Sequence, residues 1–220
     1  MADFLTDEEQ AERIRKAWRD YGLVIVLSVV LAIGGVIGWN MFQEHRADVR
    51  QEAADLFAEF ENARGLMGPV DEIAQTIHEQ YPNSSYEMFV YLYNAKDAAD
   101  ENEWEKSLGF LEQAHALAKD KTYQDMIRLR IARVEFQLDR LDDALASANQ
   151  IGEGYEMASL ELKGDIHRAQ SDFESATTSY EEAVEMAQSY VERERISAKL
   201  ATMPRTSETE LESNTPSPEE

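Results

Sequence analysis

The sequence predicts an all-α protein in which one N-terminal transmembrane helix precedes an α-solenoid of stacked helical hairpins. A stretch without charged residues, from Tyr21 to Phe42, stands in a chain whose formal net charge is −23. Beyond it, apolar residues recur at the three- and four-residue spacing of amphipathic helices, and no alternating strand pattern competes. Small and bulky residues also recur together at intervals of 37 and 32 residues, which is typical of repeat proteins.

The charge-free stretch, which we place at residues 21–43, is long enough to cross a membrane. About 20 apolar helical residues span the hydrocarbon core of a bilayer. A secretory signal has a shorter apolar region and a cleavage site of small residues, whereas bulky residues such as Trp39 and Phe42 stand here. A core helix of a soluble domain has a polar face, but only Ser28 and Asn40 interrupt this surface. We therefore expect an uncleaved anchor in contact with membrane lipid.

Basic residues predict the orientation of this anchor. Four of them precede it and lie close to its start: Arg13, Arg15, Lys16 and Arg19. Only Arg46 and Arg50 lie close to its end. Because cytoplasmic flanks carry the excess of Lys and Arg, we expect residues 1–20 in the cytoplasm and the rest of the chain on the far side of the membrane.

Composition excludes several classes of function. The 44 acidic residues outnumber the 21 basic ones, which argues against nucleic acid as a partner. The chain has no cysteine, and it has no HExxH motif, phosphate-binding loop or nucleophile elbow. We therefore expect no enzymatic activity, no cofactor and no metal site. Residues 204–220 are polar, acidic and rich in proline, which predicts a disordered tail.

The segment between the anchor and the tail reads as a series of short helices that repeat. Turn-forming stretches divide it, such as "YPNSS", "AKDKT" and "GEGY". One small-residue position is shared by three helices: Ala95, Ala132 and Gly164. A second small position follows twelve residues later, at Ser107, Ala144 and Ala176. A bulky residue stands three residues before the second small position, after a polar turn, at Trp104, Leu141 and Phe173.

This register resembles the tetratricopeptide repeat, in which small residues on the two helices of a hairpin face each other and let the backbones approach. We therefore expect a tetratricopeptide-repeat-like domain over residues 44–203. A fainter first copy includes Ala58 and Val70, and residues 189–203 supply a capping helix at the end.

A more specific resemblance lies between Arg128 and Ile166. There "LRIARVEFQL" leads into "DDAL", and the "GEGY" turn is followed by "LKGDI". With the short N-terminal segment and the single anchor, this part resembles the YfgM family, the ancillary subunits of the bacterial SecYEG translocon. The resemblance implies an inner-membrane protein with periplasmic repeats. It also implies three partners, namely SecYEG, a PpiD-like membrane-anchored periplasmic chaperone and nascent secretory polypeptides. The acidic tail departs from the family pattern.

The concave face of a repeat domain, formed by its first helices, is the usual binding surface. Seven residues on the predicted inward positions are candidates for contact with a partner: Phe89, Leu92, Lys96, Leu129, Arg133, Phe136 and Arg168. A lysine–asparagine clamp for a terminal carboxylate is absent, since Leu92, Leu129 and Glu161 stand where lysine would recur. The candidates form either a groove for extended, apolar polypeptide or contacts with neighbouring helices.

This organisation, together with what the family resemblance implies, leads to two possible functions. In the first, the chain is a membrane-anchored interaction module that links the Sec translocon to periplasmic chaperones and assists the biogenesis of secreted or membrane proteins. In the alternative, the chain regulates an envelope stress signalling pathway through its cytoplasmic segment, residues 1–20.

Overall fold

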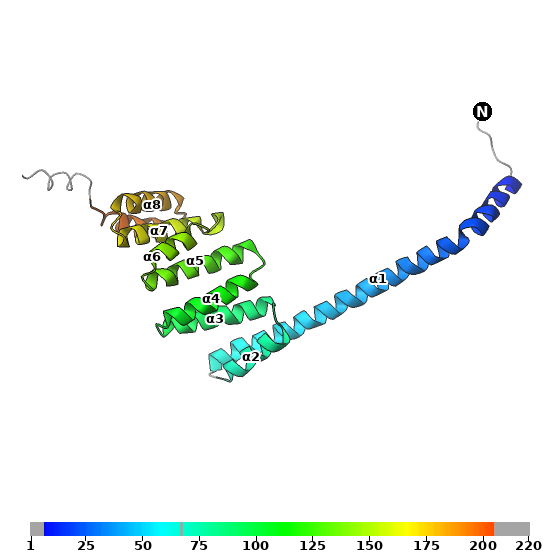
Figure 1. Cartoon of the computed structure of the whole chain (residues 1–220), viewed down its shortest axis with the longest axis horizontal. Coiled ribbons are helices and arrows are strands. Elements are labelled where there is room, and N and C mark those ends of the chain that lie inside the picture. The colour runs from blue at the N-terminus through cyan, green and yellow to red at the C-terminus, as the bar shows by residue number, and fades with distance from the viewer. Residues whose placement is uncertain (1–6, 67, 205–220) are drawn as a thin grey trace, which may run out of the picture. The chain divides into compact units, whose positions relative to one another are not determined.

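The computed structural model describes residues 7–66 and 68–204 and confirms the predicted all-α fold, with no strand among these residues. It divides into two units, Met1–Leu66 and Met67–Glu220. The first contains helix α1 (Asp7–Leu66). The helices of the second unit follow in chain order (Figure 1): α2 (Val70–Gln80), α3 (Ser85–Asp100), α4 (Trp104–Leu117), α5 (Lys121–Gln137), α6 (Leu141–Ala148), α7 (Glu156–Ala169), α8 (Phe173–Met186) and α9 (Tyr190–Leu200), with a 3-10 turn η1 (Glu153–Tyr155) before α7.

Helix α1 contains the predicted anchor. It is the one helix in the described part of the chain that is long and apolar enough to cross a membrane. The apolar side chains there are exposed, as at Leu23 (76%) and Leu31 (74%). Such a surface is unfavourable in water, so lipid is the solvent that suits it. The helix does not break at residue 43, and the point within α1 at which the membrane segment ends stays a prediction.

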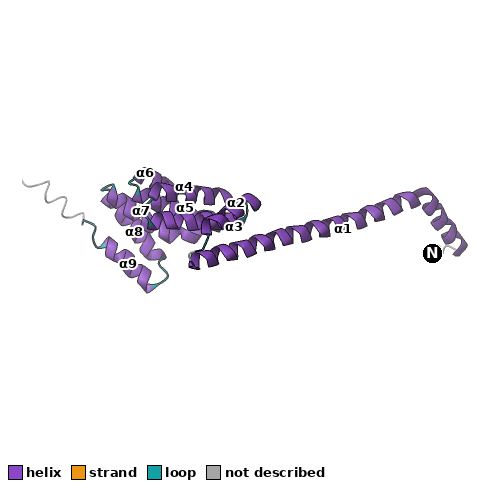
Figure 2. Cartoon of the chain, turned by 90° about the horizontal axis from the view of Figure 1, so that it is seen from below, coloured by secondary structure: helices purple, strands orange, loops and turns teal. Residues whose placement is uncertain are grey.

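The second unit is built from the predicted hairpins, α3 with α4, α5 with α6, and α7 with α8, which follow one another through the fold (Figure 2). Within each hairpin the turn contains a non-glycine residue with positive φ, at Asn102, Asp139 and Ser171. These three positions are 37 and 32 residues apart, so the turns repeat with the same intervals as the sequence pattern. Short polar side chains tolerate this conformation better than bulky ones, which explains why each turn is polar. The second helix of each hairpin begins at the bulky residue that the register placed there: Trp104, Leu141 and Phe173.

The small-residue positions are buried where the helices of a hairpin meet. Ser107 is 1% exposed, and its Oγ donates a hydrogen bond of 2.7 Å to the carbonyl oxygen of Ala95 on the facing helix. Ala132 and Ala144, the equivalent pair of the next hairpin, are both fully buried. In the third hairpin, a Cβ atom added at Gly164 would lie 2.4 Å from Cε1 of Tyr180. The backbones therefore approach as the predicted register requires.

The last helix, α9, caps the stack. A capping box joins Ser189 to Glu192 at its start, and Ile196 packs in a buried cluster with Tyr180 of α8. Three ion pairs connect α9 to α7: Arg195 Nη2 lies 2.6 Å from Glu161 Oε2, and Lys199 Nζ lies 2.9 Å from Glu161 Oε1 and 2.6 Å from Asp165 Oδ2. These pairs cover the inward positions of α7, so the predicted capping role of residues 189–203 agrees with the packing.

We expect the second unit to lose stability in acid through His115. Nη2 of Arg128 lies 3.0 Å from Nε2 of His115, a geometry in which the guanidinium donates to a neutral imidazole. Burial, and then the positive charge of Arg128, lower the pKa of His115 below its usual value of 6.5. Because the unfolded state then binds more protons, the contribution of this contact is complete above pH 6.5 and is lost as the pH falls below it.

The measurement is the free energy of unfolding of the full chain by denaturant at a series of pH values between 7.5 and 5. The variant His115→Gln keeps an acceptor for Arg128 but does not titrate, so its stability should fall less over that range. An equal fall in both proteins would contradict this assignment.

A groove between α3 and α5

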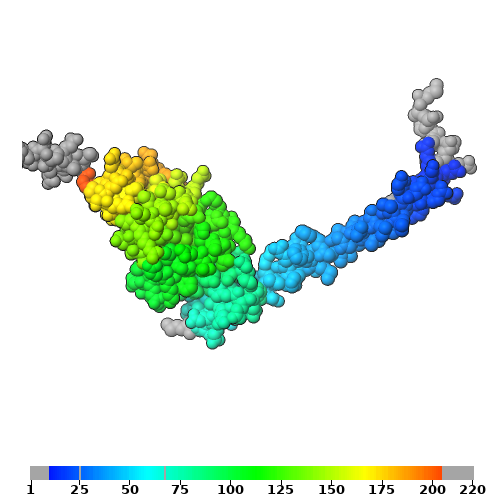
Figure 3. Space-filling model, viewed as in Figure 1, coloured from blue at the N-terminus to red at the C-terminus, as the bar shows by residue number. Residues whose placement is uncertain are grey.

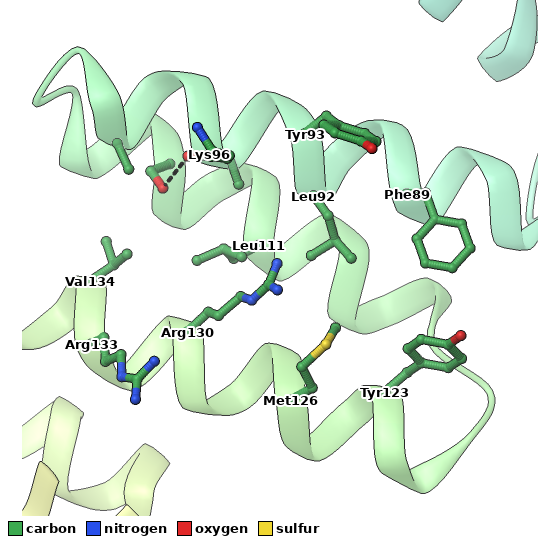
Figure 4. Close-up of a pocket in the computed structure, with 13 residues that line it drawn as sticks. Phe89, Leu92, Tyr93, Lys96, Leu111, Tyr123, Met126, Arg130, Arg133 and Val134 are labelled. Atoms are coloured by element: carbon green, nitrogen blue, oxygen red, sulfur yellow. Dashed lines mark hydrogen bonds between the residues drawn. The ribbon is translucent and has the colours of Figure 1, made fainter. Parts of the chain in front are cut away.

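A groove of about 610 Å³ lies between helices α3 and α5 (Figure 4). Its lining comes from both helices and from two residues of α4: Phe89, Leu92, Tyr93, Ala95, Lys96, Ala99, Ser107, Leu111, Tyr123, Met126, Arg130, Arg133 and Val134. Because α3 and α5 are the first helices of successive hairpins, this is the surface that the repeat register predicts for binding. In the space-filling view the hairpins form a continuous stack in chain order (Figure 3).

The apolar part of the groove is rich in aromatic and flexible side chains. The rings of Phe89 and Tyr123 meet edge to face, with centroids 5.7 Å apart, across the end of the groove. Tyr123 is 41% exposed, although it is a large apolar residue. Met126 lies beside it, and an unbranched thioether side chain adapts to varied apolar ligands. This end of the groove suits an apolar side chain of a partner.

The other end of the groove is cationic. Lys96 pairs with Asp100, one turn further along α3. Arg130 and Arg133 are both exposed, and neither forms an ion pair within the part of the chain that the structure describes. Arg130 extends from α5 into the space between the two helices (Figure 4). The groove therefore presents two guanidinium groups next to an apolar floor.

The structure brings four of the seven candidate residues to the groove, namely Phe89, Leu92, Lys96 and Arg133. Leu129 is 5% exposed and belongs to the buried cluster shared by α5, α6 and α7. Phe136 packs against that same cluster. Arg168 is exposed near the end of α7, away from this groove. Whether any of these residues contacts a partner stays a prediction.

Sequence reasoning missed Tyr93, Tyr123, Met126 and Arg130. The repeat itself contained a signal for two of them, because Met126 and Arg130 stand 37 residues after Phe89 and Tyr93, which line the facing helix. Tyr123 lies one turn before Met126 on the same face of α5. Extending the register by one turn toward the start of α5 would have found Met126, whereas Tyr93 and Arg130 directly follow the predicted positions Leu92 and Leu129.

On α7, the two positions equivalent to Leu129 and Arg133 of α5 already form ion pairs within the domain. Glu161 and Asp165 of α7 are paired with Arg195 and Lys199 of α9. Asp165 also accepts a 2.7 Å hydrogen bond from the hydroxyl of Tyr180, and burial, followed by this bond, raises the pKa of Tyr180 well above its usual range. Among the described residues no group of three or more His, Cys, Asp or Glu side chains has the arrangement of a metal site.

Comparison with known proteins identifies relatives over most of the chain. A family model described as a tetratricopeptide repeat-like domain matches residues 15–205. A protein of Haemophilus influenzae named ancillary SecYEG translocon subunit is 27% identical, over 91% of this chain and 98% of its own length. Proteins with the same name from Aggregatibacter actinomycetemcomitans and Escherichia coli are 32% and 26% identical, over 85% and 84% of this chain and 93% and 90% of their own lengths.

No solved structure matches the chain. The family match nevertheless covers almost all of it, and the relatives align over nearly their whole lengths. The chain therefore belongs to the tetratricopeptide repeat-like family of the ancillary SecYEG translocon subunits, the YfgM family that its motifs resemble.

Proposed function

We propose that this chain is a membrane-anchored protein-interaction module associated with the Sec translocon. The α3–α5 groove is the observation that carries the proposal, because it combines the exposed ring of Tyr123 with two arginines, Arg130 and Arg133, that form no ion pair among the described residues. The names of the relatives support the translocon as the place of action. The groove would receive an extended segment of a nascent secretory polypeptide or of a PpiD-like periplasmic chaperone.

The apolar part of α1 and the basic residues before it support the proposed topology. Residues 1–20 are cytoplasmic, residues 21–43 span the bacterial inner membrane, and the repeats from residue 44 onward are periplasmic. Confinement to the same membrane as the translocon raises the effective concentration of the repeats near emerging chains, so weak contacts in the groove are sufficient. The module holds and passes on polypeptide, and no chemical step is assigned to it.

Photocrosslinking in intact cells tests the groove directly. A photoreactive amino acid replaces Phe89 in the full chain, and products are probed for SecYEG subunits, for a PpiD-like chaperone and for a labelled, stalled secretory chain. The same probe at Phe173 is the control, because this residue is 40% exposed on α8 and does not line the groove. Products at Phe89 that are absent at Phe173 support the proposal, and equal products at both positions contradict it.

We expect Tyr123→Ala to weaken partner capture without unfolding the domain. Aromatic residues that anchor a partner at an interface often contribute about 1–2 kcal/mol, which corresponds to about a 5- to 30-fold loss of affinity. The measurement is the amount of the PpiD-like chaperone that copurifies with the full chain in mild detergent. Phe173→Ala removes a similarly exposed aromatic residue outside the groove and should leave the amount unchanged.

The regulatory alternative makes a different prediction. Deleting residues 2–12 would abolish a stress-signalling response while the association with the translocon continues. The interaction module predicts that this deletion leaves both the Phe89 crosslinks and the copurification unchanged.

A further inference from the structure

The groove is cationic in a chain that is otherwise strongly acidic. The chain has 44 acidic residues and only 21 basic ones. Within the described residues Arg130 and Arg133 nevertheless remain without an ion pair, on the rim of the groove. The Cβ atoms of two residues that stand three positions apart on a helix are about 5–6 Å from each other. This spacing suits a ligand with two carboxylates at a similar separation.

The sequence after α9 contains such a ligand. Residues 205–220 lie outside the described residues, and they include "ETELE" at 208–212, in which Leu211 stands between Glu210 and Glu212. In an extended chain residues two apart point to the same side, about 6.6 Å apart, and the residue between them points to the other side. Glu210 and Glu212 would thus meet the two arginines at the rim, while Leu211 faces the apolar floor.

The length of chain between α9 and this motif is sufficient. Arg195 and Lys199 pair with Glu161 and Asp165, so α9 lies beside α7, and α7 in turn packs beside α5. Two neighbouring helix spacings of 8–10 Å separate α9 from α5, about 16–20 Å in all. The eight residues from Pro204 to Leu211, which are joined by seven Cα–Cα steps, extend to about 23–25 Å. Lys199, in the last turn of α9, pairs with Asp165 of α7, which occupies the register position of Arg133 on α5.

We propose that residues 208–212 dock in the α3–α5 groove of the same chain and compete there with the partner polypeptide. Glu210 and Glu212 pair with Arg130 and Arg133, and Leu211 contacts the apolar floor near Leu92 and Met126. The competition rests on the proposed function of the groove, whereas the docking itself does not. The acidic tail, for which neither the repeat pattern nor the family resemblance gives a role, then acts as an internal pseudo-ligand.

Disulfide trapping in the full chain tests the docking. The chain has no cysteine, so the pair Met126→Cys and Leu211→Cys is the only thiol pair present. The control pair is Arg168→Cys with Leu211→Cys, because Arg168 is exposed on α7, one helix nearer to the start of the tail. A docked tail gives a higher yield of intramolecular disulfide with Met126→Cys than with Arg168→Cys under mild oxidation. A tail that only diffuses gives at least as much with the nearer control, and that result would overturn the proposal.

Reversing the charges of the arginines and of the tail glutamates tests whether disulfide formation depends on ion pairs or only on the closeness of the tail to the groove. Arg130→Glu with Arg133→Glu should lower the Met126→Cys yield to that of the control pair. Adding Glu210→Lys and Glu212→Lys to the same chain should restore it, because the pairing is then reformed with opposite signs. Failure of the second change to restore the yield would contradict the assigned pairs.

The consequence for partner binding is measured separately. A short tether gives an effective concentration on the order of 1 mM, so a docking site with an intrinsic Kd of about 0.1–1 mM lowers partner affinity by about 2- to 10-fold. Replacing Leu211, Glu210 and Glu212 by serine and glutamine should raise the yield of partner crosslinks from the photoreactive probe at Phe89 by that factor. An unchanged yield overturns the competition, while crosslinks present in both chains still support the proposed function.

Discussion

Gly164→Val should lower the midpoint of thermal unfolding by about 6–12 °C, since overpacking of about 3 kcal/mol in a buried contact shifts a domain of this size by 2–4 °C per kcal/mol. The new Cβ alone would lie 2.4 Å from Cε1 and 2.5 Å from Cδ1 of Tyr180. The ring is fully buried, and its hydroxyl is held by Asp165, so it has little room to move away. Valine has a slightly better helix propensity than glycine, and this gain of a few tenths of a kcal/mol does not offset the clash.

The chain offers a matched control for this prediction. Gly109 also lies within a helix, α4, but an added Cβ there meets no atom within 4 Å. Gly109→Val should therefore leave the midpoint unchanged or raise it slightly. A rescue is also available, because the first hairpin has Ala95 and Leu111 where the third has Gly164 and Tyr180. Gly164→Ala combined with Tyr180→Leu should be more stable than Gly164→Ala alone, and the opposite order would contradict the close approach. Thermal unfolding of the full chain followed by circular dichroism measures all of these differences.

The same pair shows what the sequence could predict about the fold and why. A glycine on one helix and a tyrosine sixteen residues later are complementary in size, and so are the alanine–leucine and alanine–alanine pairs of the other hairpins. This information is local to a hairpin, as is the turn chemistry at Asn102, Asp139 and Ser171. The starts of α4, α6 and α8 were therefore predictable to the residue.

The candidate site was only partly predictable, because it depends on contacts between hairpins. Leu92 and Leu129 occupy the same register position and are both buried, yet Leu92 borders the groove and Leu129 packs into the cluster shared with the next hairpin. Helix α6 has only 8 residues, and the chain after it returns through η1 to α7, whose Leu162 and Ile166 pack onto α5. The distance between successive first helices thus differs along the stack. The repeat pattern treats all copies alike, so it cannot predict between which two first helices a groove remains.

A similar limit applies to α1. Residues 44–66 were expected to begin the repeat domain after the anchor, and they continue the same helix. Lipid-facing and water-facing residues both satisfy backbone hydrogen bonds within a helix, so a change of solvent requires no break in the chain. The amino-acid composition indicates where α1 passes from lipid into water, whereas its backbone conformation is the same on both sides of that boundary.

Leu27→Arg combined with Leu31→Arg should release the chain from the membrane. Both side chains lie in the apolar part of α1, and they are 53% and 74% exposed. An arginine at the centre of a membrane helix costs about 2.5–3.5 kcal/mol, so two of them cost about 5–7 kcal/mol and lower insertion by about four orders of magnitude. The measurement is the fraction of the full chain that stays with bacterial membranes after extraction at alkaline pH.

Ala11→Arg with Ala17→Arg adds the same two charges to exposed positions of α1 before the span, on the side already rich in basic residues. This control should remain fully in the membrane fraction, because arginine at a cytoplasmic flank agrees with the orientation rule. Loss of SecYEG copurification in the first variant and its retention in the control would show that anchoring places the groove near the translocon. If the variant with arginines at 27 and 31 stayed in the membrane fraction, α1 would not be the anchor, and the effective-concentration argument for weak binding in the groove would no longer hold.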